Sequence, residues 1–361
     1  MRKQTKIAAL ISAAAVLSVG GAMTAFAATG WQQENGTWVY YNRNEERVTE
    51  SWQKSGDYFF YLDDKGEMAT DSLIEDDGDT YYVDINGVMV TNRWVAVDNE
   101  NAGDENEPNQ WWYYFGPNGK AYKRSDSATG DVSLKTINGK KYAFDNYGRM
   151  ISGFVVLQMK ANTIGSGYST KDIVQKVDSD NAYDTSEHYN AFVKANDGMF
   201  SSGELKSYFF GSGDDGSMKT GRQTVEMDGE KLIFEFEKTG SSKGAGVNGM
   251  ESHRFYVGGK LATADNDNKI EIVILDNNNK LIAKSSVEAA LLAYGNGGTQ
   301  HFKSNGDLDY TEFKFTRLPS GAKAYVVNTA GVMVKNGTKK DGDDFRVRTS
   351  NYTVDWVRIE E

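Results

Sequence analysis

The fold is decided by three consecutive segments: WQQENGTWVYYNRNEERVTES at 31–51, WQKSGDYFFYLDDKGEMATDS at 52–72 and LIEDDGDTYYVDINGVMVTNR at 73–93. A large apolar residue opens each segment, and Trp94 opens the next one after the same interval of 21 residues. The interval also separates three further sets of positions: Tyr41, Leu62 and Val83; Gly66 and Gly87; Met68 and Met89. A fixed period of this length predicts an array of stacked supersecondary units.

Each repeat carries the chemistry of a β-hairpin. Runs of consecutive rings favour strands, and they occur at 38–41, 58–62, 81–83 and 111–115. Asn-Gly pairs at 35–36, 86–87, 118–119 and 138–139 are typical hairpin turns. An isolated hairpin cannot bury its apolar face, so neighbouring hairpins must stack. We therefore expect a mostly β fold, a solenoid of stacked β-hairpin repeats of about 21 residues, with Tyr40, Phe60 and Tyr82 in equivalent positions.

Two stretches carry a family resemblance. Gly30-Trp31 through Tyr41, and TINGKKYAFD at 136–145, resemble the cell-wall-binding repeats of choline-binding type in Gram-positive surface proteins. The second stretch is also similar to the repeats of clostridial toxins and glucan-binding enzymes. The resemblance runs from Gly30 to Phe154 and returns at 208–221 and 325–333, about half of the mature chain. It implies a solenoid of hairpins with ligand sites in the grooves between successive units.

The sequence divides into five segments. Residues 1–27 combine a cationic start, an apolar run and Ala25-Phe26-Ala27, which predicts a signal peptide. The repeat array follows at 28–154, a partly helical insertion at 155–207, further repeats at 208–262, and a degenerate β-rich region at 263–361 that ends in a repeat-like unit.

Local patterns predict several elements inside the irregular segments. A capping signal at Ser169 opens a short amphipathic run to Val177, and 184–195 reads as a helix with both end signals. Residues 270–275 are expected to pair with 281–283 as a hairpin, and 286–294 to form a short helix that stops at Gly295.

Composition restricts the partners and the location. The net charge of −11, which becomes −14 after the signal peptide is removed, and the pI of about 5.0 give no electrostatic footprint for nucleic acid. No transmembrane segment is expected after cleavage. With Cys 0 there is no disulfide framework, which is common among exported Gram-positive proteins. We therefore expect a secreted protein, associated with the cell surface or cell wall.

The sequence offers no catalytic constellation. His188, His253 and His301 lack a metal-ligand spacing, there is no Cys nucleophile, and no serine lies in a Gly-x-Ser-x-Gly elbow. Its Asp-rich runs fit Asx turns better than calcium loops. We predict no catalytic residues, no metal site, no cofactor and no enzyme activity, because no compact catalytic domain is expected outside the repeats.

Aromatic residues are the one positive signal for a ligand, since ring faces hold both quaternary ammonium groups and the apolar faces of sugars. The resemblance implies cages of two rings from one hairpin and a third from the next. Matching positions are Trp31 and Trp38 with Trp52 or Tyr61, and Trp94 and Trp112 with Tyr142. Other units depart from the pattern, with Leu73, Thr80 and Lys141 at ring positions. The alternative is that these rings form the solenoid's own core.

These observations predict a secreted, non-catalytic surface protein that binds cell-envelope glycopolymer, of peptidoglycan, teichoic-acid or choline type, through grooves between hairpins. One alternative is an adhesin for host or dietary glycans. Another is a cell-wall hydrolase or amidase with an unrecognised catalytic part, since such repeats are often attached to hydrolases. The sequence specifies neither the polymer nor an oligomeric state.

Overall fold

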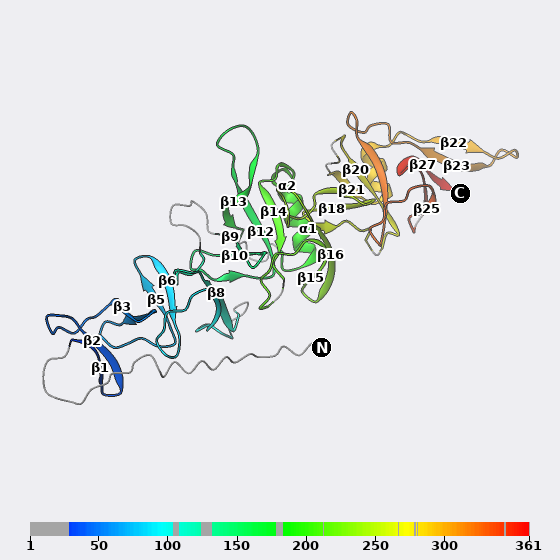
Figure 1. The fold of residues 1–361 in the computed structure, drawn as a ribbon. Helices are drawn as coiled ribbons and strands as arrows, with labels where there is room; N and C mark the ends of the chain where they lie inside the picture. Colours follow the sequence, from blue (N-terminus) through cyan, green and yellow to red (C-terminus); the bar gives the residue numbers. More distant parts are fainter. Residues whose placement is uncertain are drawn as a thin grey trace. The chain divides into compact units, whose positions relative to one another are not determined.

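The computed structural model describes residues 29–103, 108–123, 132–177, 183–211, 213–265, 267–277, 279, 281–342 and 344–360. The expected signal peptide at 1–27 therefore lies outside the described residues. The chain divides into two compact units: 1–125 with 144–150, and 126–143 with 151–361. Strands predominate and three helices occur in the described ranges, so the prediction of a mostly β fold is confirmed (Figure 1). No helix of these ranges is both long and apolar enough to span a bilayer.

The first unit contains four separate antiparallel hairpins, which follow one another along the chain (Figure 1). They are β1 (Gly30–Glu34) with β2 (Thr37–Tyr41), β3 (Ser51–Ser55) with β4 (Tyr58–Leu62), β5 (Ser72–Asp76) with β6 (Asp79–Val83), and β7 (Arg93–Asp98) with β8 (Gln110–Phe115). In the first turn, Asn35 and Gly36 have φ values of 49° and 88°, as a type I′ turn requires. The predicted hairpin repeats are confirmed, as are the predicted Asn-Gly turns at 35–36 and 138–139. The pairs at 86–87 and 118–119 are not hairpin turns as predicted: they lie in the loops after β6 and β8, because the turn of the third hairpin is Asp77-Gly78.

A short loop after each hairpin explains the repeated Asp/Asn-x-x-Gly pattern. Asp63 Oδ1 accepts hydrogen bonds from the backbone N–H of Lys65 at 2.9 Å and of Glu67 at 2.8 Å. Gly66 lies between them with a φ of 74°, which suits glycine. The same pair of side-chain bonds recurs at Asn42, Asp84, Asp145 and Asn328. The pattern is therefore a local capping motif of the loop.

Successive hairpins are joined by a repeated backbone hydrogen bond. The residue after each loop donates its N–H to a carbonyl on the second strand of the preceding hairpin. The pairs are Met68 to Trp38 at 2.8 Å, Met89 to Phe59 at 2.9 Å and Ala121 to Thr80 at 2.7 Å. In the second unit the same kind of bond joins Met218 to Lys141 at 2.8 Å, and Met333 donates to the carbonyl of His253, a hairpin-turn residue, at 3.1 Å. The repeated bond gives each hairpin the same connection to its neighbour.

Three further sheets follow the four hairpins along the chain. The first is β11 (Met150–Ile151), β10 (Lys140–Phe144) and β9 (Ser133–Ile137); the second is β13 (Tyr168–Lys176), β12 (Phe154–Ala161) and β14 (Leu205–Phe209). The third has the order β15 (Gly221–Met227), β16 (Glu230–Phe236), β19 (Lys260–Leu261), β18 (Arg254–Val257) and β17 (Gly249–Glu251). Two helices, α1 (Ser186–Ala195) and α2 (Asp197–Ser202), lie between β13 and β14 in the chain.

The insertion combines one correct and one wrong local prediction. Helix α1 is confirmed, and its N-cap Thr185 accepts a hydrogen bond from the His188 N–H. The run from Ser169 to Val177 is a strand in β13. The capping bond from the Asp172 N–H to Ser169 Oγ forms at 2.8 Å, but pairing with β12 and burial of Ile173 outweigh the local helix signal.

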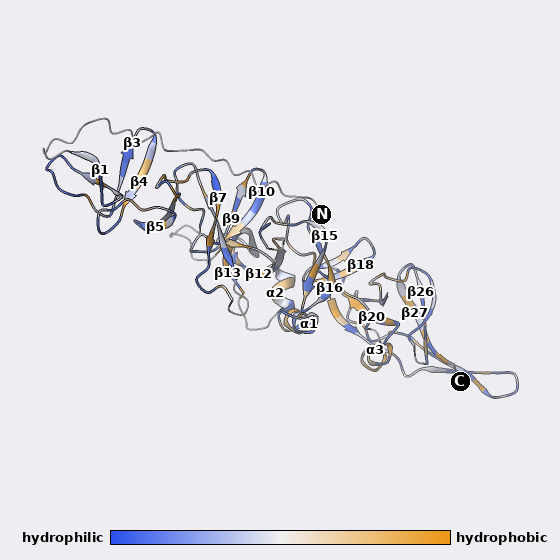
Figure 2. Ribbon diagram, turned by 90° about the horizontal axis from the view of Figure 1, so that it is seen from below, coloured by the Kyte–Doolittle hydropathy of each residue, from blue (hydrophilic) through white to orange (hydrophobic). Residues whose placement is uncertain are grey.

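The C-terminal region forms one eight-stranded sheet with the order β21 (Leu281–Ser285), β20 (Ile270–Leu275), β24 (Lys323–Asn328), β27 (Thr353–Glu360), β23 (Leu308–Phe313) and β22 (Thr299–Phe302). Strands β25 (Gly337–Lys340) and β26 (Phe345–Ser350) join it through β27. All six residues of β20 are buried, and this strand is coloured as hydrophobic in Figure 2. The predicted hairpin of β20 with β21 is confirmed.

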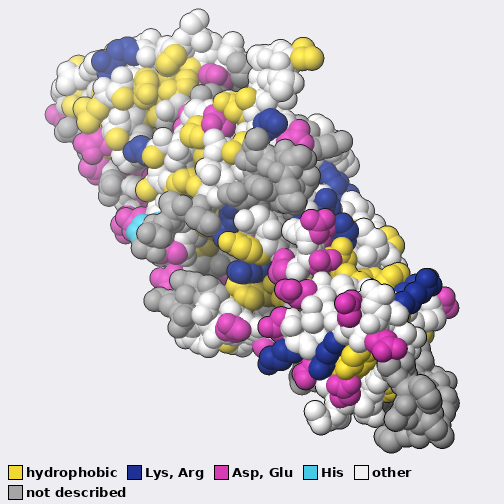
Figure 3. Space-filling view, turned by 90° about the vertical axis from the view of Figure 1, so that its left-hand side faces the viewer, with side chains coloured by type: hydrophobic (Ala, Val, Ile, Leu, Met, Phe, Trp, Pro, Cys, Tyr) yellow, Lys and Arg dark blue, Asp and Glu magenta, His cyan; other side chains and the backbone are white. Residues whose placement is uncertain are grey.

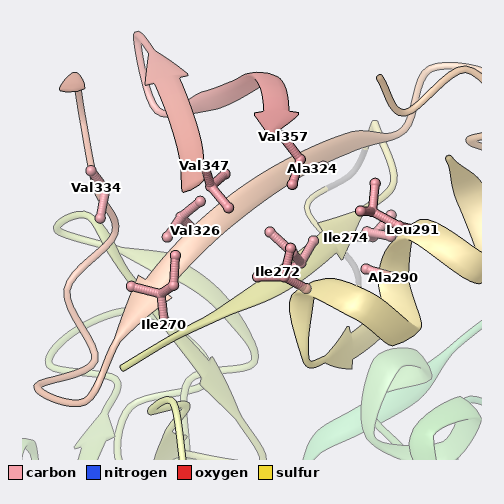
Figure 4. Packing of buried hydrophobic residues seen from close by; sticks show 11 residues of the cluster. Ile270, Ile272, Ile274, Ala290, Leu291, Ala324, Val326, Val334, Val347 and Val357 are labelled. Atoms are coloured by element: carbon pink, nitrogen blue, oxygen red, sulfur yellow. The ribbon is translucent and has the colours of Figure 1, made fainter. Parts of the chain in front are cut away.

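Helix α3 (Val287–Tyr294) covers part of this sheet and confirms the short helix expected at 286–294. Its N-cap Ser286 accepts a hydrogen bond from the Ala289 N–H. Side chains of the helix and sheet point toward one another in a common core, which includes Ile272, Ile274, Leu291, Val326 and Val357 (Figure 4). A compact core is therefore present in the segment predicted as a degenerate β-rich region at 263–361. Isolated β patterns did not reveal that these distant strands pair into one sheet.

Candidate ligand-binding faces of the hairpin repeats

Cross-strand register identifies the equivalent rings of the hairpins. The residue that opens each repeat lies opposite a tyrosine: Trp31 opposite Tyr40, Trp52 opposite Tyr61, Leu73 opposite Tyr82 and Trp94 opposite Tyr114. The expected equivalence of Tyr40, Phe60 and Tyr82 is therefore wrong at one position. Phe60 lies opposite Gln53, and a shift of one residue places a side chain on the other face of a strand.

The opening tryptophans pack between two rings, one from their own hairpin and one from the following segment of the unit. The ring centroids are 5.4 Å apart for Trp31 with both Tyr40 and Phe60, 5.2 and 5.1 Å for Trp52 with Tyr61 and Tyr81, and 5.2 and 5.8 Å for Trp94 with Tyr114 and Phe144. Aromatic pairs of this kind contribute about 0.5–1.5 kcal/mol each beyond area burial. The three opening tryptophans therefore take part in stacking the repeats.

Polar contacts of two indole groups differ. Trp52 Nε1 donates a hydrogen bond to Asp76 Oδ2 of the next hairpin at 3.1 Å, which adds a specific link between repeats. Trp31 Nε1 is buried and has no hydrogen-bond partner among the described residues. The two residues thus occupy equivalent positions, but only Trp52 has its N–H satisfied by a neighbouring carboxylate.

The predicted third rings of the cages lie as follows. Trp52 packs against Tyr61 and Tyr81. Trp31 instead contacts Phe60 of the second hairpin. Tyr142 lies in β10, in the second unit, where burial raises the pKa of its hydroxyl. Sequence reasoning missed Phe60 and Tyr81 as contacts between repeats. Their positions follow from the register, which the 21-residue interval alone does not give.

A second ring position shares the face of each opening residue. It lies two residues before the cross-strand tyrosine and is occupied by Trp38, Phe59, Thr80 and Trp112 in successive hairpins. Because residues i and i+2 of a strand point to the same side, these side chains accompany the opening residues. Trp38 and Trp112 were predicted here, and Phe59 was missed although it follows Trp38 by the same 21 residues.

The residues opposite the second ring position set its character. Phe59 is 39% exposed, and Lys54 Nζ lies 5.6 Å from its ring centroid. Thr80 is buried and its hydroxyl donates a hydrogen bond to Glu75 Oε1 at 2.8 Å. The third hairpin therefore replaces the ring with an internal polar pair, in agreement with the expectation that Thr80 interrupts the cages.

One aromatic site of the first unit is already filled by a cation of the chain. The Arg149 guanidinium carbon lies 4.6 Å from the Trp111 ring centroid and 4.7 Å from that of Tyr147. Burial raises the pKa of the neighbouring Tyr113 hydroxyl, while the Arg149 charge acts in the opposite direction. Rings of this site therefore bind an internal guanidinium, so the site differs chemically from an open cage.

Two contacts of the first unit involve acidic side chains beside the hairpins. Lys120 forms an ion pair with Asp79, and the Tyr82 hydroxyl donates a hydrogen bond to Asp71, which together with burial raises the pKa of Tyr82. Acidic side chains are scattered among hydrophobic and basic ones on the face seen in Figure 3. Within the described ranges, no group of three or more His, Cys, Asp or Glu side chains is placed to hold a metal ion.

Stacked hairpins with tryptophan on one face define a class of β-hairpin repeat proteins. Residues 48–94, which include β3 to β6, match the family model of the choline-binding repeat. This match confirms the identification of these hairpins as repeats of choline-binding type. No curated protein sequence matches the chain at a significant level.

Solved structures of three Streptococcus pneumoniae proteins are among those similar to this chain. Choline binding protein F has 19% identity over 65% of this chain and 58% of its own, with a TM-score of 0.37. CbpJ from strain TIGR4 has 15% identity over 90% and 94%, with a TM-score of 0.32. The modular autolysin LytC has 18% identity over 85% and 52%, with a TM-score of 0.27. The chain thus covers little more than half of two of these proteins, and such TM-scores do not establish a common overall arrangement.

Proposed function

We propose that this chain is a secreted, non-catalytic surface protein that binds a cell-envelope glycopolymer, of peptidoglycan, teichoic-acid or choline type, through the ring faces of its hairpins. The observation that carries the proposal is the match of 48–94 to choline-binding repeats, together with half-buried or exposed rings at the second ring position of three hairpins. Those rings are Trp38, Phe59 and Trp112.

The chemistry of these faces suits repeated weak binding. A ring face attracts a quaternary ammonium by about 0.5–2 kcal/mol, depending on how far the contact is desolvated. Several such faces on one chain gain apparent affinity for a repetitive polymer without any new contact. The net charge of −11 opposes attraction to an anionic polymer, which favours stacking over charge as the source of affinity.

Within this proposal, the two ring positions have different tasks. Trp31, Trp52 and Trp94 each contact a ring beyond their own hairpin, so on the same face they hold successive repeats together. Trp38 and Trp112 provide the outward contact with the ligand. This division refines the predicted cages, in which all these tryptophans touch the ligand.

The test is retention of the full chain on purified cell walls, followed by elution with choline or with free sugars. We expect Trp38→Ala and Trp112→Ala to reduce retention at least severalfold while the melting temperature changes little. Ile85→Ala is the matched control, because Ile85 is a large apolar side chain of the same unit that is 77% exposed. Equal retention of both tryptophan variants and the control would contradict the proposal, as would retention on foreign glycans alone.

The non-catalytic part of the proposal has its own measurement. We expect no release of soluble fragments when the full chain is incubated with peptidoglycan, with or without added zinc. Reproducible turnover that is abolished by a single Asp, Glu or His substitution would contradict this part and favour a hydrolase.

A further inference from the structure

Two hairpin turns of the second unit depart from a rule that four other hairpin turns obey. Type I′ turns need a positive φ at both central residues and strongly prefer glycine at the second. Glycine occupies that position at 35–36, 77–78, 138–139 and 228–229. In the turn between β17 and β18 the residues are Ser252 and His253, with φ values of 50° and 60°. In the turn between β26 and β27 they are Asn351 and Tyr352, with φ values of 47° and 73°.

The two exceptional residues meet each other. The His253 and Tyr352 rings are stacked, with centroids 4.6 Å apart and an angle of 14° between their planes. A bulky residue at positive φ is unusual and costs stability, and such strain gathers at binding and catalytic sites. Here the cost is incurred twice, in turns from distant parts of the chain, to place two rings side by side.

Backbone hydrogen bonds hold both turns in place. The Met333 N–H donates to the His253 carbonyl at 3.1 Å, and the Tyr352 N–H donates to the Lys335 carbonyl at 2.7 Å. Met333 and Lys335, the partners in these two bonds, both belong to the short segment after β24. The same piece of chain therefore positions the two rings. The ring pair is therefore set in place before any ligand arrives.

The stacked rings line an open cleft of about 710 Å³. This volume lies in the range of about 300–1,000 Å³ that small-molecule sites occupy. The wall adds apolar rings at Phe315 and Tyr325, polar groups at Asn351 and Thr353, and ammonium groups at Lys314 and Lys323. A third ammonium, Lys335 Nζ, lies 5.8 Å from the Tyr352 ring centroid. Asp355 is the acidic group of the lining.

We propose that this cleft binds a saccharide unit that carries an anionic group, either a carboxylate or a phosphate. Rings accept the apolar face of a sugar, and amide and hydroxyl groups can hydrogen-bond to its hydroxyls. Lys314 is paired with Glu312 at 3.7 Å and Asp355 with Arg348 at 3.9 Å, so the ammonium groups of Lys323 and Lys335 are the ones that favour a negative substituent. The inference rests on the proposed function in assuming a glycopolymer ligand, but it places a separate site, built from other residues, in the second unit.

The experiment is a calorimetric or NMR titration of the full chain with three probes: glucuronic acid, glucose 6-phosphate and glucose. We expect saturable binding of at least one acidic probe, at least tenfold tighter than that of glucose. The two acidic arms distinguish a carboxylate from a phosphate as the preferred group. Absence of saturable binding for both acidic probes, or equal affinity for glucose, would overturn the proposal.

Two variants separate a binding role from a purely structural role. His253→Gly removes the ring and relieves the backbone strain, so we expect affinity to fall at least tenfold while the melting temperature stays equal or rises. Lys323→Gln should reduce the affinity for the acidic probe to that for glucose. Phe302→Ala is the control, since Phe302 is 60% exposed in the same unit and does not line the cleft. A lower melting temperature with unchanged affinity in His253→Gly would overturn the proposal.

The outcomes also separate this proposal from the proposed function. If retention on walls depends on Trp38 but the chain binds none of the three probes, the cleft proposal is wrong and the proposed function is unaffected. Binding of an acidic probe by a chain that walls do not retain would support the cleft and contradict the proposed function.

Discussion

Gly87→Ala tests whether the Gly-x-Met pattern exists to join successive repeats. A Cβ atom at Gly87 would lie 2.9 Å from Met68 Cε and Sδ and 3.1 Å from the Ala69 carbonyl oxygen. The φ of Gly87 is 77°, so alanine would also adopt a left-handed conformation. The conformational cost is about 1–2 kcal/mol, and forcing a methyl group into a packed contact costs about 1–3 kcal/mol. We therefore expect the free energy of unfolding to fall by about 2–5 kcal/mol.

A matched variant isolates the packing contribution. Gly36 has a similar φ of 88°, but a Cβ there would meet nothing within 4 Å. Gly36→Ala should therefore cost only the conformational part, about 1–2 kcal/mol. The assay is urea-induced unfolding of the full chain, followed by tryptophan fluorescence. The double variant Met68→Ala with Gly87→Ala should recover part of the loss, because the two sites are in contact.

Equal destabilisation of the chain by Gly36→Ala and Gly87→Ala would contradict this prediction, because the glycine would then serve only the turn conformation. Absence of coupling between Met68 and Gly87 in the double variant would also contradict it, because the contact between repeats would then contribute nothing measurable.

Three further predictions concern packing, titration and salt. Trp52→Ala should lower the free energy of unfolding by up to about 3–5 kcal/mol, the cost of truncating a large ring, because the half-buried Trp52 packs against Tyr61 and Tyr81. Trp52→Phe should lose mainly the hydrogen bond to Asp76. Urea unfolding checks both variants, and equal costs would contradict the assigned hydrogen bond. Burial lowers the pKa of Lys260 from 10.5 to about 8, so the folded chain releases this proton first and the free energy of unfolding should rise between those pH values. Lys260→Met should reduce this increase of the free energy of unfolding with pH, measured from unfolding curves at several pH values. If the pH dependence is unchanged in the variant, the lowered pKa of Lys260 is contradicted. Retention on walls should survive about 0.5 M salt, where the Debye length is roughly 4 Å, because salt screens exposed charges but not ring stacking. Elution of the chain by that salt would indicate that charge attraction is the source of binding.

Short-range chemistry made the repeat unit predictable. The Asp/Asn-x-x-Gly loops depend on hydrogen bonds from one side chain to N–H groups two and four residues later, and the Asn-Gly turns depend on two adjacent residues. These interactions lie within one segment, so the 21-residue pattern contains them fully. Helix α1 and helix α3 were found for the same reason, since their caps are local.

The positions of the aromatic rings were only partly predictable from the sequence. Spacing located Trp38 and Trp112, but the register decided that Tyr61 is the equivalent of Tyr40, and packing decided that Trp31 contacts Phe60. A period shows which residues repeat, while the partner of a ring in the next hairpin depends on how far one hairpin is displaced against another.

The sequence by itself determined the repeat period, the hairpins, the turns at 35–36 and 138–139 and the capped loops, because each depends on residues close together in the chain. Only the tertiary structure decided that 168–176 pairs as β13, that β24 lies between β20 and β27, and that the turns at 252–253 and 351–352 meet. Strand pairing is open to many partners of similar apolar character. The choice among them is made by burial of whole faces, as when β20 places all six of its residues in the interior, and no local pattern encodes that outcome.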